Sequence, residues 1–399
     1  MSGSIIPMLD LAREHVLIAD EVQRAWADTL RGMQLSNGPQ AAAFEREIAA
    51  YVGVAHARGT SSGTDALMLA MAALDIGPGD RVIVPANTFV GVLEAVHTVG
   101  ATPVLVDVEA DGFGPDLDAI ECALPAKAVV AVHLYGAALD LRALGARCER
   151  AGAHLIEDGS HAHGAQRGGR CVGGFGDIGC FSAGVVKNLG AYGDAGFVTT
   201  GHARLADEVG RLRWHGQRGK NDHVRYGWNC RLDELQAAVL RIKLRHLEAR
   251  NQRRRDIAAF YSERLAPLGV RTPSADADEV PVYHQYVVRT DRRDALRTHL
   301  TSRGVETGIH YPVPLHRQTA WGRAYGHAGS FPRAERLAAE ILSLPVFPDL
   351  SAAEVETVVG AVESFFGAGA PQRRRVASAR APGAPPRPMN RVRSRQAQR

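Results

Sequence analysis

"RVIVPANTFVGVLEAVHTVGATPVLVDV" (residues 81–108) contains two β-rich runs separated by a helix-period run. Apolar residues are nearly continuous in residues 81–84 and 102–108, as is typical of strands that are buried on both faces. Residues 89–100 space their apolar side chains as one face of a helix does. The stretch therefore predicts two parallel buried strands joined by a helix.

The same alternation continues on both sides of this stretch. Further strands are predicted at 128–136, 153–158, 177–183 and 196–200, and further helices at 65–74 and 141–152. Strands that alternate with helices favour an open α/β sheet, whose ligands gather at the carboxyl ends of the strands. We expect this large domain to occupy residues 1–235.

A long helical segment at 231–265 leads away from the predicted sheet. It is followed by a smaller α/β unit with strands at 282–290 and 305–311 and helices at 292–304 and 351–366. We expect this second domain to occupy residues 236–367. Residues 368–399 are rich in arginine, proline and alanine, contain no acidic residue, and are predicted to be a disordered tail.

The composition excludes several classes of protein. The chain has 399 residues and a net charge of +4, but the basic tail supplies that excess, so nucleic-acid binding is not expected for the folded part. No apolar run is long enough to span a membrane, and the N-terminus does not resemble a signal peptide. Five scattered cysteines fit reduced thiols, and we expect a cytoplasmic location.

Lysine is rare in this chain, with four lysines among 47 basic residues. One of them, Lys187, lies in the glycine-rich segment 184–196 between two predicted strands. Unlike arginine, a desolvated lysine can lose its proton and form a Schiff base with a carbonyl compound. An ordinary solvated loop lysine is the alternative for this residue taken alone.

A turn of small residues precedes the helix predicted at 65–74. Ser62, Gly63 and Thr64 would present backbone N–H groups at the positive end of that helix, which suits a phosphate group. A simple helix N-cap, with Ser62 or Thr64 as the cap, is the alternative interpretation.

Asp158 ends the apolar strand at 153–158, so it is expected at the ligand-binding edge of the sheet. A carboxylate there needs a positive partner, and in a pyridoxal phosphate enzyme the pyridinium N–H is that partner. A helix-capping role is the alternative. His161 and His163 follow, but their spacing offers no recognisable metal-ligand set, so no metal is expected.

Six segments in order, among them "GTSSGTDAL", "IEDGSHAHGA", "FSAGVVKNLGAYGDAGFVTT" and "TGIHYPVPLHRQ", resemble the DegT/DnrJ/StrS family of sugar aminotransferases. The resemblance covers residues 5–365. It implies the type I fold of pyridoxal 5′-phosphate-dependent aminotransferases, an α/β class with a large, mostly parallel open sheet flanked by helices and a smaller C-terminal α/β domain. It also implies a homodimer whose active sites lie at the subunit interface.

The resemblance assigns roles to individual residues. Lys187 would carry the cofactor as a Schiff base and move the proton, Asp158 would hold the pyridine nitrogen, and Phe89 would stack on the ring. Phosphate contacts would come from Ser62, Gly63, Thr64, Ser182 and, from the neighbouring subunit, Asn229. On the substrate side the resemblance places His310 and Tyr311, with Lys220 and Arg225 as diphosphate contacts, and His316 and His284 as residues that are either structural or functional.

Two positions refine this assignment. Position 161 is more often glutamine in the family, beside the phenolic oxygen of the cofactor, and His161 here resembles members that act on other sugar positions or in the amino-shikimate branch. Family members that remove a hydroxyl group have histidine in place of the Schiff-base lysine. Lys187 therefore argues against a dehydratase.

These features predict a transaminase that moves an amino group from an amino acid, glutamate or glutamine, to a nucleotide-linked keto-deoxysugar in amino-sugar or antibiotic biosynthesis. One alternative keeps the cofactor but uses a cyclitol or amino-shikimate ketone. A second alternative is a non-enzymatic regulator that binds pyridoxal phosphate or a sugar and contacts DNA through the tail. The absence of a recognisable helix-turn-helix argues against that regulator.

Overall fold

The computed structural model describes residues 5–327 and 329–367, and the tail predicted at 368–399 lies outside the described residues. Its helices are α1 (Leu11–Gly32), α2 (Pro39–Val52), α3 (Gly63–Ala73), α4 (Gly91–Thr98), α5 (Leu117–Ala123), α6 (Arg142–Ala151), α7 (Ala203–Leu212), α8 (Glu234–Leu265), α9 (Arg293–Ser302), α10 (Thr319–Tyr325), α11 (Pro332–Glu340) and α12 (Ala352–Gly367). Its strands are β1 (His56–Thr60), β2 (Arg81–Pro85), β3 (Thr102–Val106), β4 (Ala128–Val132), β5 (His154–Asp158), β6 (Gln166–Arg167), β7 (Arg170–Cys171), β8 (Ile178–Ser182), β9 (Gly196–Thr200), β10 (Gln217–Gly219), β11 (Asp222–His223), β12 (Glu279–Val280), β13 (Tyr286–Arg289) and β14 (Ile341–Leu344).

The predicted open α/β sheet is present as a seven-stranded sheet in the order β1-β9-β8-β5-β4-β2-β3. Strands β3, β2, β4, β5 and β8 are parallel to one another, whereas β9 is antiparallel to both β8 and β1. The sheet is therefore mostly parallel, as predicted, with one reversed strand. Parallel order brings the carboxyl ends of β4, β5 and β8 to one edge.

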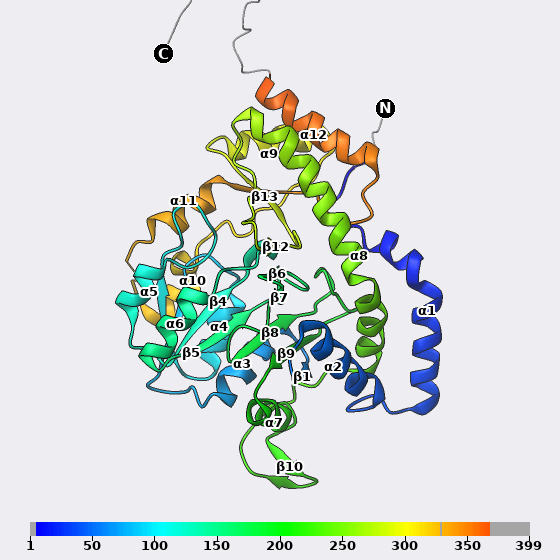
Figure 1. The fold of residues 1–399 in the computed structure, drawn as a ribbon, viewed down its shortest axis with the longest axis vertical. Coiled ribbons are helices and arrows are strands. Elements are labelled where there is room, and N and C mark those ends of the chain that lie inside the picture. The colour runs from blue at the N-terminus through cyan, green and yellow to red at the C-terminus, as the bar shows by residue number, and fades with distance from the viewer. Residues whose placement is uncertain (1–4, 328, 368–399) are drawn as a thin grey trace, which may run out of the picture.

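Helices cover both faces of this sheet (Figure 1) because successive strand residues point to opposite sides. In β2, Val82 and Val84 pack into the core that contains α3 and α4, while Ile83 packs into the core that contains α5 and α6. A third core joins α2 and the first half of α8 to Phe181 and Phe197 of β8 and β9. All of these side chains are almost fully buried.

The chain beyond the middle of α8 builds a second core. Residues of α8, α9 and α12 pack around the antiparallel pair β13–β14, and Ile6 from the N-terminal segment joins them. Figure 1 shows α9 and α12 together at the end of the molecule where α8 terminates. The long helix thus contributes its two halves to two different cores.

The strand predicted at 305–311 is wrong. Val305 and Gly308 form only isolated bridges, to Ile6 and Ser343 respectively. The partner of β13 is instead β14, which the sequence did not indicate because "AAEILSL" continues the apolar spacing of α11. Helices α1, α2, α5, α10 and α11 and the short sheet β12-β6-β7 were also not predicted.

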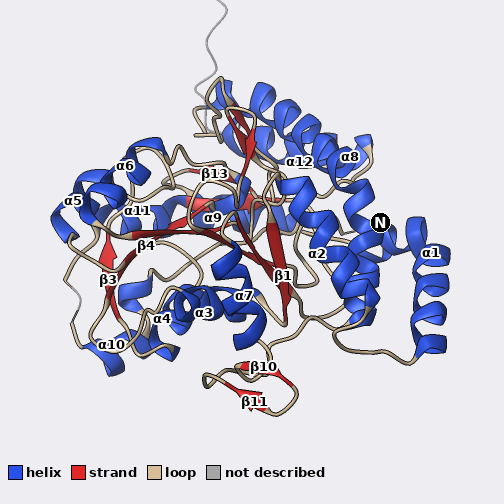
Figure 2. Cartoon of the chain, turned by 60° about the horizontal axis from the view of Figure 1, so that its bottom comes forward, coloured by secondary structure: helices blue, strands red, loops and turns tan. Residues whose placement is uncertain are grey.

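A hairpin formed by β10 and β11 projects from the body of the molecule (Figure 2). Large apolar side chains around it are exposed: Trp214 at 43%, Val224 at 44% and Tyr226 at 101%. Exposed apolar side chains gathered on one projection are typical of a protein–protein contact. Within the described part of the chain, no helix is long and apolar enough to cross a membrane.

Candidate active site

A cavity of about 460 Å³ lies at the carboxyl edge of the large sheet. Its walls come from the start of α3, the loops after β2, β4, β5 and β8, and two segments of the C-terminal part. The residues that line it are Ser62, Gly63, Thr64, Leu67, Thr88, Phe89, Gly91, Val92, Val132, Leu134, Asp158, Ser160, His161, Ser182, Gly184, Val185, Val186, Lys187, Asp194, His284, Gln285, His310 and Tyr311. The volume is within the range of about 300–1,000 Å³ for small-molecule sites.

The predicted phosphate turn forms one wall. Ser62 is the N-cap of α3, and its Oγ accepts a hydrogen bond from the N–H of Asp65 at 3.0 Å. Gly63 lies so close to the end of β8 that a Cβ on it would be 2.5 Å from Cβ of Ser182. Ser62 therefore caps the helix and also lines the cavity, so the two interpretations of this turn are compatible. Thr64 and Ser182 line the same wall.

Asp158 and the preceding Glu157 point to opposite sides of the sheet. Glu157 is fully buried and accepts hydrogen bonds from three backbone N–H groups and from Nε2 of His133. Asp158 is 6% exposed and lines the cavity, where Oδ1 accepts from the N–H of Ser160 at 3.0 Å. The partners of Glu157 are thus complete, while Asp158 remains available to a positive group in the cavity.

Lys187 lies opposite in a tight loop between β8 and β9. Its N–H donates to the carbonyl of Gly184 at 2.9 Å, and a Cβ on Gly190 would lie 2.6 Å from the carbonyl oxygen of Val185. Burial lowers the pKa of the Lys187 amine to about 8, against a smaller opposing effect of Asp158. A substantial fraction of the amine is therefore neutral near neutral pH, as a nucleophilic lysine requires.

His161 is buried between Lys187 and His284. Burial, followed by the nearby charge of Lys187, holds its pKa well below the usual value. Its Nδ1 lies 3.2 Å from the backbone N–H of Tyr135, which donates to it, so the ring proton of neutral His161 is on Nε2. Tyr135 adopts the left-handed conformation, with φ of 62°, and that conformation directs this N–H.

His284 packs against His161 with ring centroids 4.5 Å apart. The amide nitrogen of Asn188 donates to Asn251 and to the carbonyl of Val282, so Oδ1 of Asn188 accepts from Nδ1 of His284 at 3.1 Å. His284 therefore carries its proton on Nδ1, the opposite tautomer to His161. Of the two roles left open for His284, the structure gives it a position on the cavity wall.

Aromatic side chains form the mouth of the cavity. Phe89 is half exposed, and its ring centroid lies 5.6 Å from that of Tyr311. His310 is adjacent, with Nδ1 2.9 Å from Oγ of Ser343, and the hydroxyl of Tyr135 donates to its carbonyl oxygen. Phe89, His310 and Tyr311 therefore meet at one opening, although they come from distant parts of the sequence.

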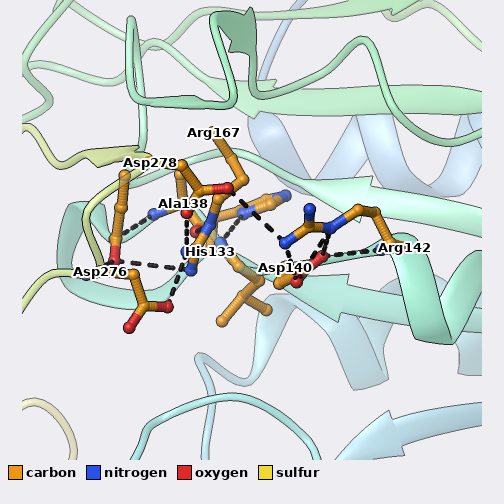
Figure 3. Close-up of polar contacts among 9 residues, drawn as sticks. His133, Ala138, Asp140, Arg142, Arg167, Asp276 and Asp278 are labelled. Atoms are coloured by element: carbon orange, nitrogen blue, oxygen red, sulfur yellow. Dashed lines mark hydrogen bonds and ion pairs between the residues drawn. The ribbon is translucent and has the colours of Figure 1, made fainter.

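An ion-pair network centred on Arg167 holds the segment that precedes β12 (Figure 3). Nη1 of Arg167 lies 2.7 Å from carboxylate oxygens of both Asp276 and Asp278, and its Nε donates to the carbonyl of Ala138 at 3.1 Å. Arg167 thus joins the loop after β4 to the loop before β12. Nearer the cavity, the N–H groups of Val282 and Gln285 donate to the carbonyls of Gly136 and Tyr135 at 2.9 and 3.1 Å, which holds residues 284–285 at the cavity wall.

Four predicted site residues do not line the cavity of their own chain. Lys220 and Asn229 are exposed near the projecting hairpin, and Arg225 forms ion pairs with Asp75 at 3.1 Å and Glu208 at 3.3 Å. His316 is buried, with Nε2 2.9 Å from Glu335. The cavity residues not predicted include Thr88, which could have been found from its position just after β2, and Gln285 and Asp194, which carry no local signal.

The residues present fit pyridoxal phosphate. The turn at Ser62–Thr64 suits its phosphate, the buried carboxylate of Asp158 suits a protonated ring nitrogen, and the Lys187 amine suits its aldehyde. Among the residues with described coordinates, no three His, Cys, Asp or Glu side chains converge to hold a metal ion. Fold and cavity together define a pyridoxal phosphate-dependent aminotransferase of the type I fold.

The chain belongs to the DegT/DnrJ/EryC1/StrS aminotransferase family, whose family model matches residues 16–363. It is 44% identical over 363 residues to the dTDP-3-amino-3,4,6-trideoxy-α-D-glucose transaminase of Streptomyces venezuelae, an alignment that covers 90% of this chain and 96% of the relative.

Two solved structures support the same conclusion. The structure of DesV from S. venezuelae in complex with a ketimine intermediate is 43% identical, with a TM-score of 0.89 over 91% of this chain and 99% of DesV. NtdA from Bacillus subtilis, solved with the bound cofactor PMP, is 28% identical, with a TM-score of 0.85 over 92% of this chain and 86% of NtdA. The recognition and fold class predicted from the sequence are confirmed.

Proposed function

We propose that this chain transfers an amino group from glutamate or glutamine to a nucleotide-linked keto-deoxysugar, with pyridoxal 5′-phosphate as its cofactor. The Lys187 amine carries this proposal, because it is held by burial at a pKa of about 8 inside the cavity that also contains Asp158. When bound, the cofactor supplies an aldehyde for the nitrogen and a ring that accepts electron density.

Three groups on the cavity wall divide the work. The turn at Ser62–Thr64 and the hydroxyl of Ser182 bind the phosphate, and Asp158 keeps the ring nitrogen protonated by an ion pair in a dry environment. Phe89 lies at the mouth beside Tyr311, where its ring would cover the cofactor and limit the entry of water.

Lys187 and His161 handle protons at defined atoms. With the cofactor bound, Nζ of Lys187 as a neutral amine would accept the α-proton of the donor and would later donate a proton to the carbon that receives the nitrogen. Nε2 of His161 donates a hydrogen bond toward the phenolic oxygen of the cofactor, the task of the amide in relatives with glutamine at this position. His310 and Tyr311 contact the sugar at the mouth.

We further propose a homodimer with shared active sites. The exposed apolar side chains of Trp214 and Tyr226 support an interface at the projecting hairpin. In such a dimer Asn229 binds the phosphate in the partner site, and Lys220 and Arg225 are positioned for the diphosphate of the sugar nucleotide there. The five unpaired cysteines favour a reducing compartment, in agreement with a cytoplasmic enzyme.

The Lys187→Ala variant tests the central proposal. It is expected to lose the visible absorbance of the bound cofactor, the mass added after borohydride reduction, and nearly all turnover. Lys127→Ala is the matched control, because Lys127 lies outside the cavity lining. An unchanged visible spectrum in Lys187→Ala would overturn the assignment of the lysine.

A panel of keto substrates tests the acceptor. Nucleotide-linked keto-deoxysugars are expected to regenerate the aldehyde form of the cofactor after a donor half-reaction, and a cyclitol ketone or an amino-shikimate ketone is not. If either of those ketones regenerated the aldehyde form faster than the keto-deoxysugars do, that ketone would replace the proposed acceptor. The assignment as an aminotransferase would still stand.

Subunit exchange tests the shared site. Inactive Lys187→Ala and inactive Asn229→Asp dimers are mixed and allowed to exchange subunits. If Asn229 acts in the partner site, each hybrid dimer has one site with both lesions and one intact site, so activity returns. If Asn229 acts in its own subunit, both sites remain damaged and no activity appears.

A further inference from the structure

A second cavity, of about 230 Å³, adjoins the main cavity. The two share four wall residues, Val186, His284, Gln285 and His310. The second cavity is completed by Met8, Leu9, Arg254, Gly308 and Val346. Its volume is below the usual range for sites that hold a whole drug-sized ligand, so it suits a small group attached to a molecule in the main cavity.

Arg254 carries the one permanent charge among the described residues that line this side cavity. It projects from the second half of α8 and is 6% exposed. Its hydrogen bonds within the described part of the chain run from Nη1 to the carbonyls of Tyr283 at 3.3 Å and Val346 at 3.2 Å. That leaves Nε and Nη2, the two donors on one side of the guanidinium, for another acceptor.

Arg250, which lies one turn earlier on the same helix, is paired with carboxylates. Arg250 forms ion pairs with Glu14 at 3.3 Å and with Asp349 at 2.7 Å, whereas no ion pair of Arg254 is present among residues 5–327 and 329–367. Burial lowers the pKa of Arg254 to about 9, and the nearby Arg250 acts in the same direction, against smaller opposing effects of Glu14 and Asp349, which form no ion pair with it. A buried cation without a carboxylate is costly unless an anion completes it.

The side cavity is close to the reacting lysine. The pKa of His284 is lowered by burial first and then by nearby positive groups, which include both Lys187 and Arg254. One imidazole ring therefore lies near the amine and near the guanidinium. Because the main cavity and the side cavity share four wall residues, a molecule with its nitrogen at Lys187 can extend a second group from one cavity into the other.

We infer that Arg254 binds a carboxylate group of the amino donor in this side cavity while the nitrogen of the donor lies at Lys187. The inference rests on the proposed function and names the donor subsite of that same site. A guanidinium with two adjacent free N–H donors matches the two oxygens of a carboxylate. That carboxylate is either the α-carboxylate, present in every donor, or the side-chain carboxylate of glutamate.

The test uses the holoenzyme and follows the donor half-reaction alone by the change in the cofactor spectrum. In Arg254→Gln, the glutamate concentration that gives half the maximal rate is expected to rise by about 10- to 100-fold. Arg253→Gln is the matched control, since Arg253 is the preceding residue of α8 and lies outside both cavities. Arg254→Lys, which keeps the charge but loses the two-point geometry, is expected to fall between wild type and Arg254→Gln.

Three donors distinguish the two sources of the carboxylate. If the α-carboxylate binds Arg254, the Arg254→Gln variant loses apparent affinity for glutamate, glutamine and alanine to the same extent. If the side-chain carboxylate binds Arg254, the variant loses apparent affinity for glutamate alone. A second readout is equilibrium binding of glutarate, a dicarboxylate that cannot react, measured by its effect on the cofactor spectrum of wild type and Arg254→Lys. Glutarate is expected to bind wild type more tightly, and this comparison stands even if Arg254→Gln fails to fold.

Failure of the inference differs from failure of the proposed function. The inference would be overturned if both Arg254 variants reached half the maximal rate at the same donor concentration as wild type and bound glutarate as tightly. Amino transfer itself would remain intact in that case. A normal donor half-reaction without transfer to any keto sugar would overturn the proposed acceptor and leave the role of Arg254 standing.

Discussion

The backbone N–H of Tyr135 donates a hydrogen bond to Nδ1 of His161 across 3.2 Å of buried space. That contact places the proton of the neutral ring on Nε2, so His161 offers a donor to the cavity. An amide side chain at the same position would offer a donor as well. A backbone group in a left-handed turn thus lets a histidine offer the same kind of donor that a glutamine amide would offer here.

The first prediction follows from this equivalence. His161→Gln is expected to keep kcat/KM within about tenfold of wild type, and His161→Phe to lower it by roughly 10- to 100-fold, the cost of one lost hydrogen bond in a dry site. Steady-state kinetics with a fixed donor measure both. Equal losses in the two variants would show that shape, and not donation, matters at this position.

The pKa of His161, held well below its ordinary value, adds a pH criterion. A histidine whose pKa lies well below 6.5 stays neutral between pH 6.5 and pH 8. The difference in kcat/KM between wild type and His161→Phe is therefore expected to stay constant over that interval. A difference that appears only above pH 6.5 would mean that His161 titrates normally.

The second prediction concerns capture of the cofactor by the apoprotein. Only the neutral amine of Lys187 attacks an aldehyde, and burial lowers its pKa from 10.5 to about 8. The rate constant for the growth of absorbance is therefore expected to rise with pH and to level off above about pH 8. An ordinary lysine would give a rate that still rises tenfold per pH unit at pH 9. Stopped-flow mixing of apoprotein with pyridoxal phosphate distinguishes these profiles.

The large sheet was predictable because each of its parallel strands has a local signal. Val82–Val84 and Val129–Ala131 are apolar on both faces, and only a strand buried between two helix layers needs that pattern. The C-terminal part was predicted less well. The segment that contains Val305 and Gly308 was expected to be a strand of the small sheet. Instead, Ile6, some 300 residues earlier in the chain, pairs with the backbone at Val305.

The site divides in the same way. Lys187, Asp158 and the turn at Ser62 stand out because each is an unusual residue at a strand end or a helix start. Arg254 does not, because in "RRRD" it resembles its neighbours until the fold buries it. Of those neighbours, Arg255 pairs with Glu248 and Arg253 donates to the carbonyl of Leu350. Position in space, and not residue type, separates a site arginine from a surface one.

The third prediction concerns the contact of Gly63 with Ser182. A Cβ on Gly63 would lie 2.5 Å from Cβ and 2.8 Å from Cα of Ser182, so Gly63→Ala must push the phosphate turn away from β8. The dissociation constant of pyridoxal phosphate is expected to rise by about tenfold or more, as for loss of one or two hydrogen bonds. Equilibrium dialysis of the cofactor measures the change.

Gly360→Ala is the control for Gly63→Ala, because a Cβ on Gly360 in α12 meets no atom within 4 Å. That variant is expected to bind the cofactor as wild type does, with a small gain in helix stability. Cofactor affinity that is unchanged in Gly63→Ala would mean that the turn does not hold the phosphate.

The last prediction concerns Glu157, the buried neighbour of Asp158. Its two oxygens accept four hydrogen bonds, from the N–H groups of Gly173, Phe175 and Gly176 and from Nε2 of His133. In Glu157→Gln the amide NH₂ must face two of these donors in either orientation, which leaves them unpaired in the core. We expect the free energy of unfolding to fall by roughly 2–4 kcal/mol.

Urea unfolding of the apoprotein measures this loss, with Glu149→Gln on the exposed face of α6 as the matched control. Because Nδ1 of His133 accepts from the N–H of Leu139, the His133 ring already donates from Nε2 and cannot turn to accept from the new amide without losing that second bond. Equal midpoints for the two glutamate variants would show that the four donors find water or other acceptors when the carboxylate is gone.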